Sequence, residues 1–339
     1  MDKMRLGRTE IMASKSGFGA LPIQRVSFDE ARLLLSNAYE NGINFFDTAR
    51  AYSDSEEKIG FALSSVRKNI FIATKSGAHD KKTLLEHLGQ SLRTLKTDYI
   101  DLYQLHNPPQ LPDYDDPDGM YQALVDARAK GLIRFIGVTN HRLSLALEAV
   151  NSDRFDTVQF PFSLLASERD LELVRVCREK DIGFIAMKAM SGGLITNPAA
   201  AFAYLRQFDN VLPIWGIQRE SELDDFLRLE KAPPALDGEI MRIIERDRLE
   251  LSGSFCRGCG YCQPCPAGIP IDLAARMKFL LRRSPPKPWL TDDFKAKMER
   301  IENCTGCNHC RNNCPYGLDT PKILKEMLAD YREFYAANT

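Results

Sequence analysis

The sequence predicts an α/β protein: a (β/α)8 TIM barrel followed by a small, mostly helical domain. Three observations predict this order. Apolar runs that suit buried parallel strands alternate with amphipathic, helix-like segments as far as residue 229. The ends of the apolar runs lie mostly about 30 residues apart, which is the size of one βαβ unit. Past residue 229 the alternation stops, and eight of the nine cysteines follow.

The strands are expected to be short and buried. Ser27, followed three residues later by Glu30, forms a capping-box pattern at the start of the first long helix. An open doubly wound sheet would need a glycine-rich phosphate loop after an early strand, and no G-x-G-x-x-G stands there, so the closed barrel is preferred. The expected strands are 16–21, 43–46, 70–74, 99–105, 135–140, 157–160, 183–188 and 211–216. The expected helices are 27–41, 56–66, 81–96, 120–130, 144–150, 170–180, 198–208 and 221–229.

The domain limits follow from the same change of pattern. We expect the barrel in residues 1–235, a linker with a short helix in 236–251, and the cysteine-rich domain in 252–339. Within the last of these, the apolar pattern of 271–281 predicts one helix.

Composition narrows the class of protein. The chain is 44% hydrophobic and 27% charged, as is ordinary for a soluble globular protein, and its net charge of -1 argues against nucleic acid as a partner. The charged N-terminus lacks the apolar region of a signal peptide, and no apolar run approaches the ~20 residues of a membrane span. We therefore expect a cytoplasmic protein that binds no membrane and whose clustered cysteines serve metal binding rather than disulfides.

Polar residues stand where three of the expected strands end. Asp47 and Tyr52 follow the second strand, Lys75 follows the third, and His106 follows the fourth. Each alone is more often a solvated surface residue or a packing residue. Because the carboxyl ends of barrel strands form the active-site face, the four together indicate a catalytic rim.

Together with the opening Leu6-Gly7-Arg8-Thr9, these residues resemble the aldo-keto reductase family over roughly residues 3 to 230. The resemblance places the family's catalytic tetrad on Asp47, Tyr52, Lys75 and His106. It implies hydride exchange between a nicotinamide coenzyme and a small carbonyl or alcohol, with Tyr52 as proton donor. Lys75 is expected to lower the Tyr52 pKa, Asp47 to hold Lys75, and His106 to orient the carbonyl.

The resemblance also implies coenzyme contacts. Asn140 and Gln159 would bind the carboxamide, although a turn residue and a buried strand hydrogen bond explain them equally well. The pair Gly19-Ala20 would lie under the ribose. Where many members carry an aromatic residue, this chain has Met187, and the following Lys188 could reach a phosphate.

The adenosine end of the coenzyme would meet the segment that contains Gln218, Arg219 and Glu222. Arg219 is the cation expected near the phosphate. Many members carry an arginine near position 222, and a carboxylate there favours the free ribose hydroxyl of NAD. NADP is the usual coenzyme of the family, so the sequence leaves both coenzymes open.

The cysteines form two runs, each closed by a proline: 256, 259, 262 and 265, then 304, 307, 310 and 314. Such runs are typical of two-cluster ferredoxins, in which the distant fourth cysteine ligates the other cluster. We therefore assign Cys256, Cys259, Cys262 and Cys314 to one [4Fe-4S] cluster, and Cys304, Cys307, Cys310 and Cys265 to a second. Zinc bound by four cysteines is the less favoured alternative. The whole chain resembles the variety of aldo-keto reductases with a C-terminal ferredoxin-like domain.

The sequence is compatible with three functions. The first is an NAD(P)-dependent reductase or alcohol dehydrogenase whose clusters exchange electrons with a ferredoxin-like or other redox partner. The second is an electron-transfer protein whose barrel is a docking body, and the third is a reductase with purely structural clusters. Residues 252–339 carry thirteen Lys and Arg and nine Asp and Glu, a net charge of +4 that would suit an acidic carrier or simply a solvated surface. The ninth cysteine, Cys177, is expected in the barrel's packing.

Overall fold

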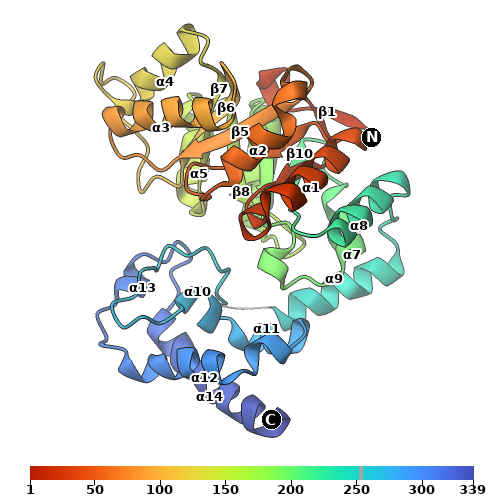
Figure 1. Ribbon diagram of the computed structural model, residues 1–339, viewed down its shortest axis with the longest axis vertical. Helices are drawn as coiled ribbons and strands as arrows, with labels where there is room; N and C mark the ends of the chain where they lie inside the picture. Colours follow the sequence, from red (N-terminus) through yellow and green to blue (C-terminus); the bar gives the residue numbers. More distant parts are fainter. Residues whose placement is uncertain (252–254) are drawn as a thin grey trace. The chain divides into compact units, whose positions relative to one another are not determined.

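The computed structural model describes residues 1–251 and 255–339 (Figure 1). The chain forms two compact units, one of residues 1–189 with 198–240 and one of residues 190–197 with 241–339. The predicted limits 1–235, 236–251 and 252–339 remain a prediction; a helix, α9 (Gly238–Glu250), occupies most of the segment expected as a linker.

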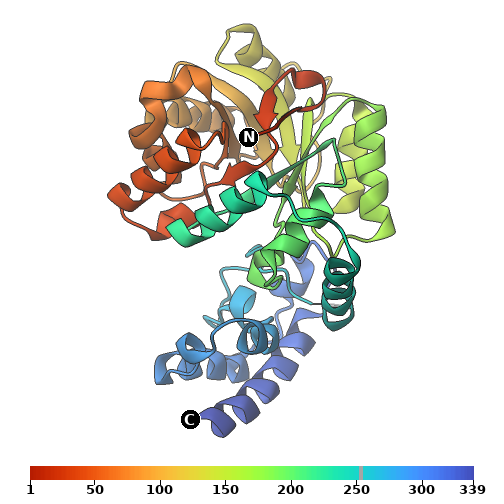
Figure 2. The ribbon, with the colours of Figure 1, turned by 90° about the vertical axis from the view of Figure 1, so that its right-hand side faces the viewer.

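The first unit is a closed barrel of eight parallel strands in the order β10-β3-β4-β5-β6-β7-β8-β9, so the predicted barrel is confirmed (Figures 1 and 2). Each strand pairs with the next along the chain, and β10 returns to β3, which leaves no open edge. The strands are β3 (Gly17–Gly19), β4 (Phe45–Asp47), β5 (Phe71–Ser76), β6 (Ile100–His106), β7 (Ile133–Thr139), β8 (Thr157–Pro161), β9 (Gly183–Met187) and β10 (Val211–Gly216).

Helices lie outside the strands and follow the predicted segments within a few residues (Figure 2). The capping box at Ser27 is present: Ser27 Oγ accepts from the backbone N–H of Glu30, and Ser27 N donates to the Glu30 carboxylate at 2.8 Å. The barrel helices are α1 (Phe28–Glu40), α2 (Ser55–Leu63), α3 (Lys81–Thr94), α4 (Met120–Ala129), α5 (Leu143–Ser152), α6 (Glu168–Glu179), α7 (Pro198–Leu205) and α8 (Glu220–Lys231).

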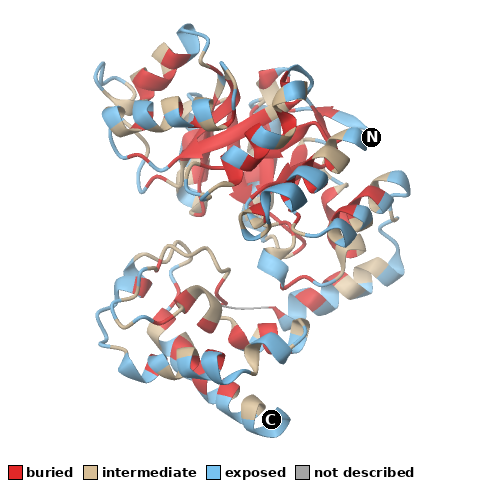
Figure 3. Cartoon of the chain, in the orientation of Figure 1, coloured by how far each residue is buried: buried red, intermediate tan, exposed pale blue. Residues whose placement is uncertain are grey.

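An apolar cluster fills the inside of the barrel, and the strands are almost wholly buried (Figure 3). Phe45, Ala73 and Leu102 belong to this cluster. Because side chains on a strand alternate between its two faces, residues two positions further on share the inner face. The inner face therefore continues to Asp47, Lys75 and Gln104 towards the carboxyl ends of the strands.

A small antiparallel hairpin, β1 (Lys3–Arg5) and β2 (Met12–Ser14), precedes the barrel and was not predicted. Met4, Leu6, Ile11 and Ala13 from this segment pack into the inner apolar cluster. Two strands of three residues are too short to show a clear alternating pattern in the sequence, so only the packing reveals the hairpin.

The second unit is helical. The single helix expected over 271–281 is wrong: the structure has α10 (Ile271–Ala274) and α11 (Met277–Arg283), separated at Arg276, whose φ of -131° and ψ of 14° leave the helical region. The Arg276 guanidinium donates to Gly192 O at 2.9 Å within the same unit. The other α-helices in the described residues of this unit are α12 (Asp292–Glu299), α13 (His309–Asn312) and α14 (Thr320–Asn338). Among the described residues, no helix combines the length and the apolar character that crossing a membrane requires.

Candidate active site and cysteine clusters

A buried ion pair lies at the carboxyl ends of β4 and β5. Lys75 Nζ lies 2.6 Å from Asp47 Oδ1 and also donates to Thr48 O at 2.6 Å. Both side chains are almost fully buried. Burial raises the pKa of Asp47 and lowers that of Lys75, and the charge of each partner opposes the shift of the other.

Tyr52 and His106 complete the predicted tetrad around this pair. Lys75 Nζ lies 5.2 Å from the centroid of the Tyr52 ring, and the His106 ring meets the Tyr52 ring edge to face with centroids 5.8 Å apart. Asp47, Lys75 and His106 come from three neighbouring strands, and Tyr52 comes from the turn after β4. The structure thus brings all four residues together.

The pKa of Tyr52 shifts in the direction opposite to the one expected from the sequence. Burial, together with the Asp47 carboxylate, raises the pKa of Tyr52, whereas Lys75 was expected to lower it. The expectation was wrong because desolvation of the phenolate and the Asp47 charge outweigh the attraction of the Lys75 ammonium, which Asp47 and Thr48 O also engage. Burial, assisted by the Lys75 charge, lowers the pKa of His106 to about 3, so its imidazole is neutral at physiological pH.

Gln159 lies in the same buried group. Its Nε2 donates to Asp47 Oδ1 at 3.5 Å, and its Oε1 accepts from Gln104 Nε2 at 3.0 Å. Sequence reasoning assigned Gln159 to the carboxamide and missed Gln104. The missed residue had a signal, because it stands two positions before His106 on one strand and therefore shares its face.

The other residues expected near the nicotinamide and ribose lie around the strand ends. Asn140 follows β7; its Nδ2 donates to Pro108 O at 3.1 Å and its Oδ1 accepts from Arg142 N at 2.8 Å. Gly19 ends β3, and Ala20 N donates to Asp47 O at 2.8 Å, so this pair borders the aspartate. A Cβ at Gly19 would lie 3.1 Å from Trp215 O, which leaves little room for a larger residue.

The residues expected at the phosphate and adenosine lie at the ends of β9 and β10. Lys188 follows β9 with a left-handed φ of 57°, while Met187 packs against the inner apolar cluster. Glu222 Oε2 accepts from the backbone N–H of Gln218 at 2.8 Å and of Arg219 at 3.1 Å, so this carboxylate caps the N-terminus of α8. The Arg219 side chain is exposed and lies 3.7 Å from Glu222 Oε1.

The cysteines gather around two cavities in the second unit. Cys256, Cys259, Cys262 and Cys314 line one cavity, with Cys310 at its wall. The other is lined by Cys265, Cys304, Cys307 and Cys310. The two groups follow the crossed grouping that the spacing predicts, although ligation itself remains a proposal.

The thiols fit a group that compensates their negative charge. All nine cysteines are free of disulfides. Burial, with the charges of Cys256 and Cys259, raises the pKa of Cys262 to about 12, so four thiolates there need a bound group that compensates their charge. Within residues 1–251 and 255–339, no three His, Cys, Asp or Glu residues are placed to hold a single metal ion. Cys177 is fully buried in α6, where burial raises its pKa to about 12.

Comparison with known proteins identifies both parts of the chain. The sequence profile of the Aldo/keto reductase family matches residues 15–210, and that of the 4Fe-4S dicluster domain matches residues 255–319. An uncharacterised oxidoreductase of Bacillus subtilis, YqkF, is 31% identical over 210 residues, which cover 58% of this chain and 67% of that relative.

Solved structures agree with the sequence comparison. The holo form of an aldo-keto reductase from Bacillus halodurans matches with a TM-score of 0.62 and 24% identity over 73% of this chain and 96% of that one. A thermostable aldo-keto reductase in complex with the inhibitor epalrestat matches with a TM-score of 0.61 and 26% identity over 73% of this chain and all of that one. The chain therefore belongs to the aldo/keto reductase family and carries a 4Fe-4S dicluster domain after its barrel.

Proposed function

We propose that the barrel reduces a small carbonyl compound, or oxidises the corresponding alcohol, by hydride exchange with NAD(P)H. The observation that carries the proposal is the buried Asp47–Lys75 pair at 2.6 Å against the rings of Tyr52 and His106. Bound NAD(P)H would supply the hydride and leave as NAD(P)+. The carbonyl then needs only one proton to become an alcohol.

Tyr52 gives that proton to the carbonyl oxygen as negative charge develops there. Because burial and Asp47 raise its pKa, the phenol is protonated at neutral pH and is ready to donate. The nearby Lys75 ammonium favours the phenolate that is left, and solvent then restores the proton. The neutral His106 imidazole can donate a hydrogen bond to the same oxygen and so orient the carbonyl.

The chain has residues that fit the coenzyme. Gln104 Oε1 is buried without a hydrogen-bond partner among the described residues, so the rim holds an unused acceptor beside Gln159 and Asp47. Asn140 keeps a second amide hydrogen for the carboxamide. Gly19 and Ala20 would border the ribose, and Lys188, Gln218 and Arg219 would meet the phosphates and adenosine.

The coenzymes NAD and NADP differ at the position that Glu222 would face. NADP is the family's usual coenzyme. A carboxylate favours a free ribose hydroxyl and repels a 2′-phosphate, which supports NAD. Arg219 is the neighbouring cation that would favour NADP, but it lies in an ion pair with Glu222. Separate assays with the two nucleotides decide between them.

We further propose that the two groups of cysteines hold two [4Fe-4S] clusters, Cys256, Cys259, Cys262 and Cys314 holding one and Cys265, Cys304, Cys307 and Cys310 the other. Clusters supply one-electron transfer when bound. A ferredoxin-like or other redox partner would then exchange electrons with this domain. We also propose that the protein acts in the cytoplasm and that its substrate is a small molecule.

An anaerobic experiment tests these proposals. The protein is purified without oxygen, its iron and sulfide are measured, and NADH or NADPH is added with a nitrobenzaldehyde as the probe substrate. The wild type is expected to oxidise one nucleotide with aldehyde reduction. The Tyr52→Phe variant is expected to lose about 10²–10⁴-fold in kcat with little change in nucleotide Kd, because only the proton donor is removed.

The visible absorbance of the clusters gives the second readout. Bleaching on addition of a nucleotide supports electron exchange between coenzyme and clusters. Aldehyde reduction without bleaching favours structural clusters or an outside donor. If neither nucleotide binds, the reductase proposal fails and an electron-transfer protein with a docking barrel takes its place.

A further inference from the structure

The catalytic candidate Tyr52 lies on an irregular turn, residues 48–54, which needs support from outside. Ser53 in this turn has a left-handed φ of 36°, a conformation that is strained for a non-glycine residue and persists only where the surroundings impose it. Two backbone bonds attach the first part of the turn to β5: Thr48 N to Ala73 O at 2.8 Å and Arg50 N to Lys75 O at 2.9 Å.

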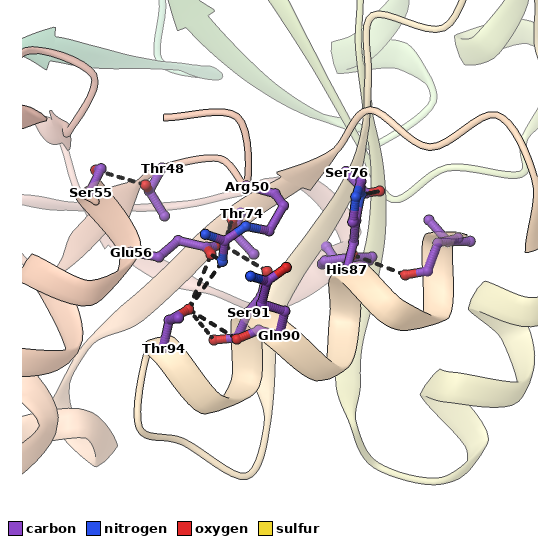
Figure 4. A network of polar contacts seen from close by, with 12 residues as sticks. Thr48, Arg50, Ser55, Glu56, Thr74, Ser76, His87, Gln90, Ser91 and Thr94 are labelled. Atoms are coloured by element: carbon purple, nitrogen blue, oxygen red, sulfur yellow. Dashed lines mark hydrogen bonds and ion pairs between the residues drawn. The ribbon is translucent and has the colours of Figure 1, made fainter. Parts of the chain in front are cut away.

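A buried carboxylate supplies further attachment. Glu56, in the first turn of α2, is 1% exposed. It accepts from Thr74 Oγ1 at 2.6 Å, from Ser91 Oγ at 2.7 Å and from Thr94 Oγ1 at 3.2 Å, and it pairs with the Arg50 guanidinium (Figure 4). These donors come from β5, from α3 and from the turn that carries Tyr52.

Strand β5 connects this network to the catalytic rim. Thr74 and Lys75 are neighbours in the strand, so their side chains lie on opposite faces. Lys75 faces inward to Asp47. Thr74 faces Glu56 (Figure 4). Burial lowers the pKa of Lys75, and the Glu56 charge, together with Asp47, opposes this shift and so favours the ammonium form.

We propose that Glu56 is a positioning residue: through Arg50 and Thr74 it holds the Tyr52-bearing turn against β5, so that the phenol meets the carbonyl oxygen. The inference rests on the proposed reductase function and names a residue that does not itself touch the substrate. A buried carboxylate is costly unless it is paired and hydrogen-bonded, and this one is fully engaged. A misplacement of about 1 Å at a reacting group is enough to cost about 10²-fold in rate.

The test is Glu56→Gln, which keeps the shape and removes the charge. We expect amide hydrogen exchange in residues 48–55 to accelerate at least about tenfold. We expect kcat to fall about 10–10²-fold, nucleotide Kd to stay within about twofold, and the D2O isotope effect on kcat to increase as proton transfer becomes limiting.

Asp101→Asn is the matched control. Asp101 is also 1% exposed and accepts from Ile72 N at 3.0 Å, Arg67 at 2.7 Å and Arg134 at 2.8 Å, but near the start of β6 and away from the turn. The Asp101→Asn variant is expected to have a lower melting temperature. Its amide hydrogen exchange in residues 48–55 and its D2O isotope effect on kcat are expected to match the wild type.

The outcomes separate the two proposals. Should Glu56→Gln behave like Asp101→Asn, or leave the exchange of residues 48–55 at the wild-type rate, the positioning role is overturned. If the Gln variant does not fold, Thr74→Val replaces it, because this change removes a single hydrogen-bond donor to Glu56. It is expected to accelerate hydrogen exchange of the amides in residues 48–55 about threefold. Exchange at the wild-type rate would overturn the proposal. A wild type without aldehyde turnover refutes the reductase function, while the exchange measurement still decides whether Glu56 holds the turn.

Discussion

At the scale of single residues, the candidate site depends on the two faces of one strand. Lys75 contacts Asp47 and the Tyr52 ring on the inner side, while its neighbour Thr74 donates to Glu56 on the other. An insertion of one residue in β5 would exchange these two faces. The chemistry of the rim therefore depends on strand register as much as on residue identity.

His106 gives a prediction about pH. Its pKa is lowered to about 3, so it binds no proton between pH 5 and 9. We expect the pH profile of kcat for reduction to show no loss of activity on the acid side from titration of this residue. A loss with a midpoint near pH 6.5 that disappears in His106→Gln would contradict a neutral imidazole at this position. In the unfolded chain the histidine takes up a proton below about pH 6.5. The free energy of unfolding should thus fall as pH drops from 7 to 5, and fall less in His106→Gln.

At the scale of elements, several barrel helices begin at a side chain that caps their first turn, among them α1, α3 and α6. The capping box of Ser27 and Glu30 begins α1, and Ser167 with Asp170 forms the same box at α6. In both boxes the side chains satisfy backbone N–H groups that the helix leaves unpaired. Such local contacts explain why the sequence places helix starts within a few residues.

Ser27→Ala tests the cap of α1. Loss of the capping bonds is expected to lower the free energy of unfolding by about 1 kcal/mol, a fall of about 2–4 °C in the melting temperature of the barrel. Ser36→Ala makes the same chemical change in the middle of α1 and is expected to be neutral or slightly stabilising, since alanine favours helix interiors. Equal losses in both variants, measured by thermal unfolding, would argue against a capping effect.

At the scale of the whole molecule, two compact units share one chain, and the second unit brings together cysteines from runs about forty residues apart. The cavity lined by most of the first run also includes Cys314 of the second run, and the cavity lined by most of the second run also includes Cys265 of the first. Ligation by both runs would cross-link the helical unit, so cluster binding and folding of this unit should be coupled.

Iron content tests this coupling. Cys262→Ser, purified without oxygen, is expected to lose about half of the iron or more and to become sensitive to proteolysis in residues 241–339, since one cluster lacks a ligand. Cys177→Ser, at a buried barrel position outside both cavities, should keep the wild-type iron content. Unchanged iron in Cys262→Ser would contradict the assignment.

The sequence by itself determined the alternation of strands and helices and the two cysteine runs, because apolar periodicity and ligand spacing are local properties. The four candidate tetrad residues were predicted from their places at strand ends and from the family resemblance. The tertiary structure decided what depends on contacts between distant segments. The hairpin β1–β2 became visible through its packing in the barrel, and the break at Arg276 accompanies a bond to Gly192 O. Gln104 contacts Gln159, and Glu56 contacts Ser91, because folding brings separate strands and helices together. Folding also places Tyr52 where desolvation and the Asp47 charge raise the pKa that a sequence argument expected to be lowered.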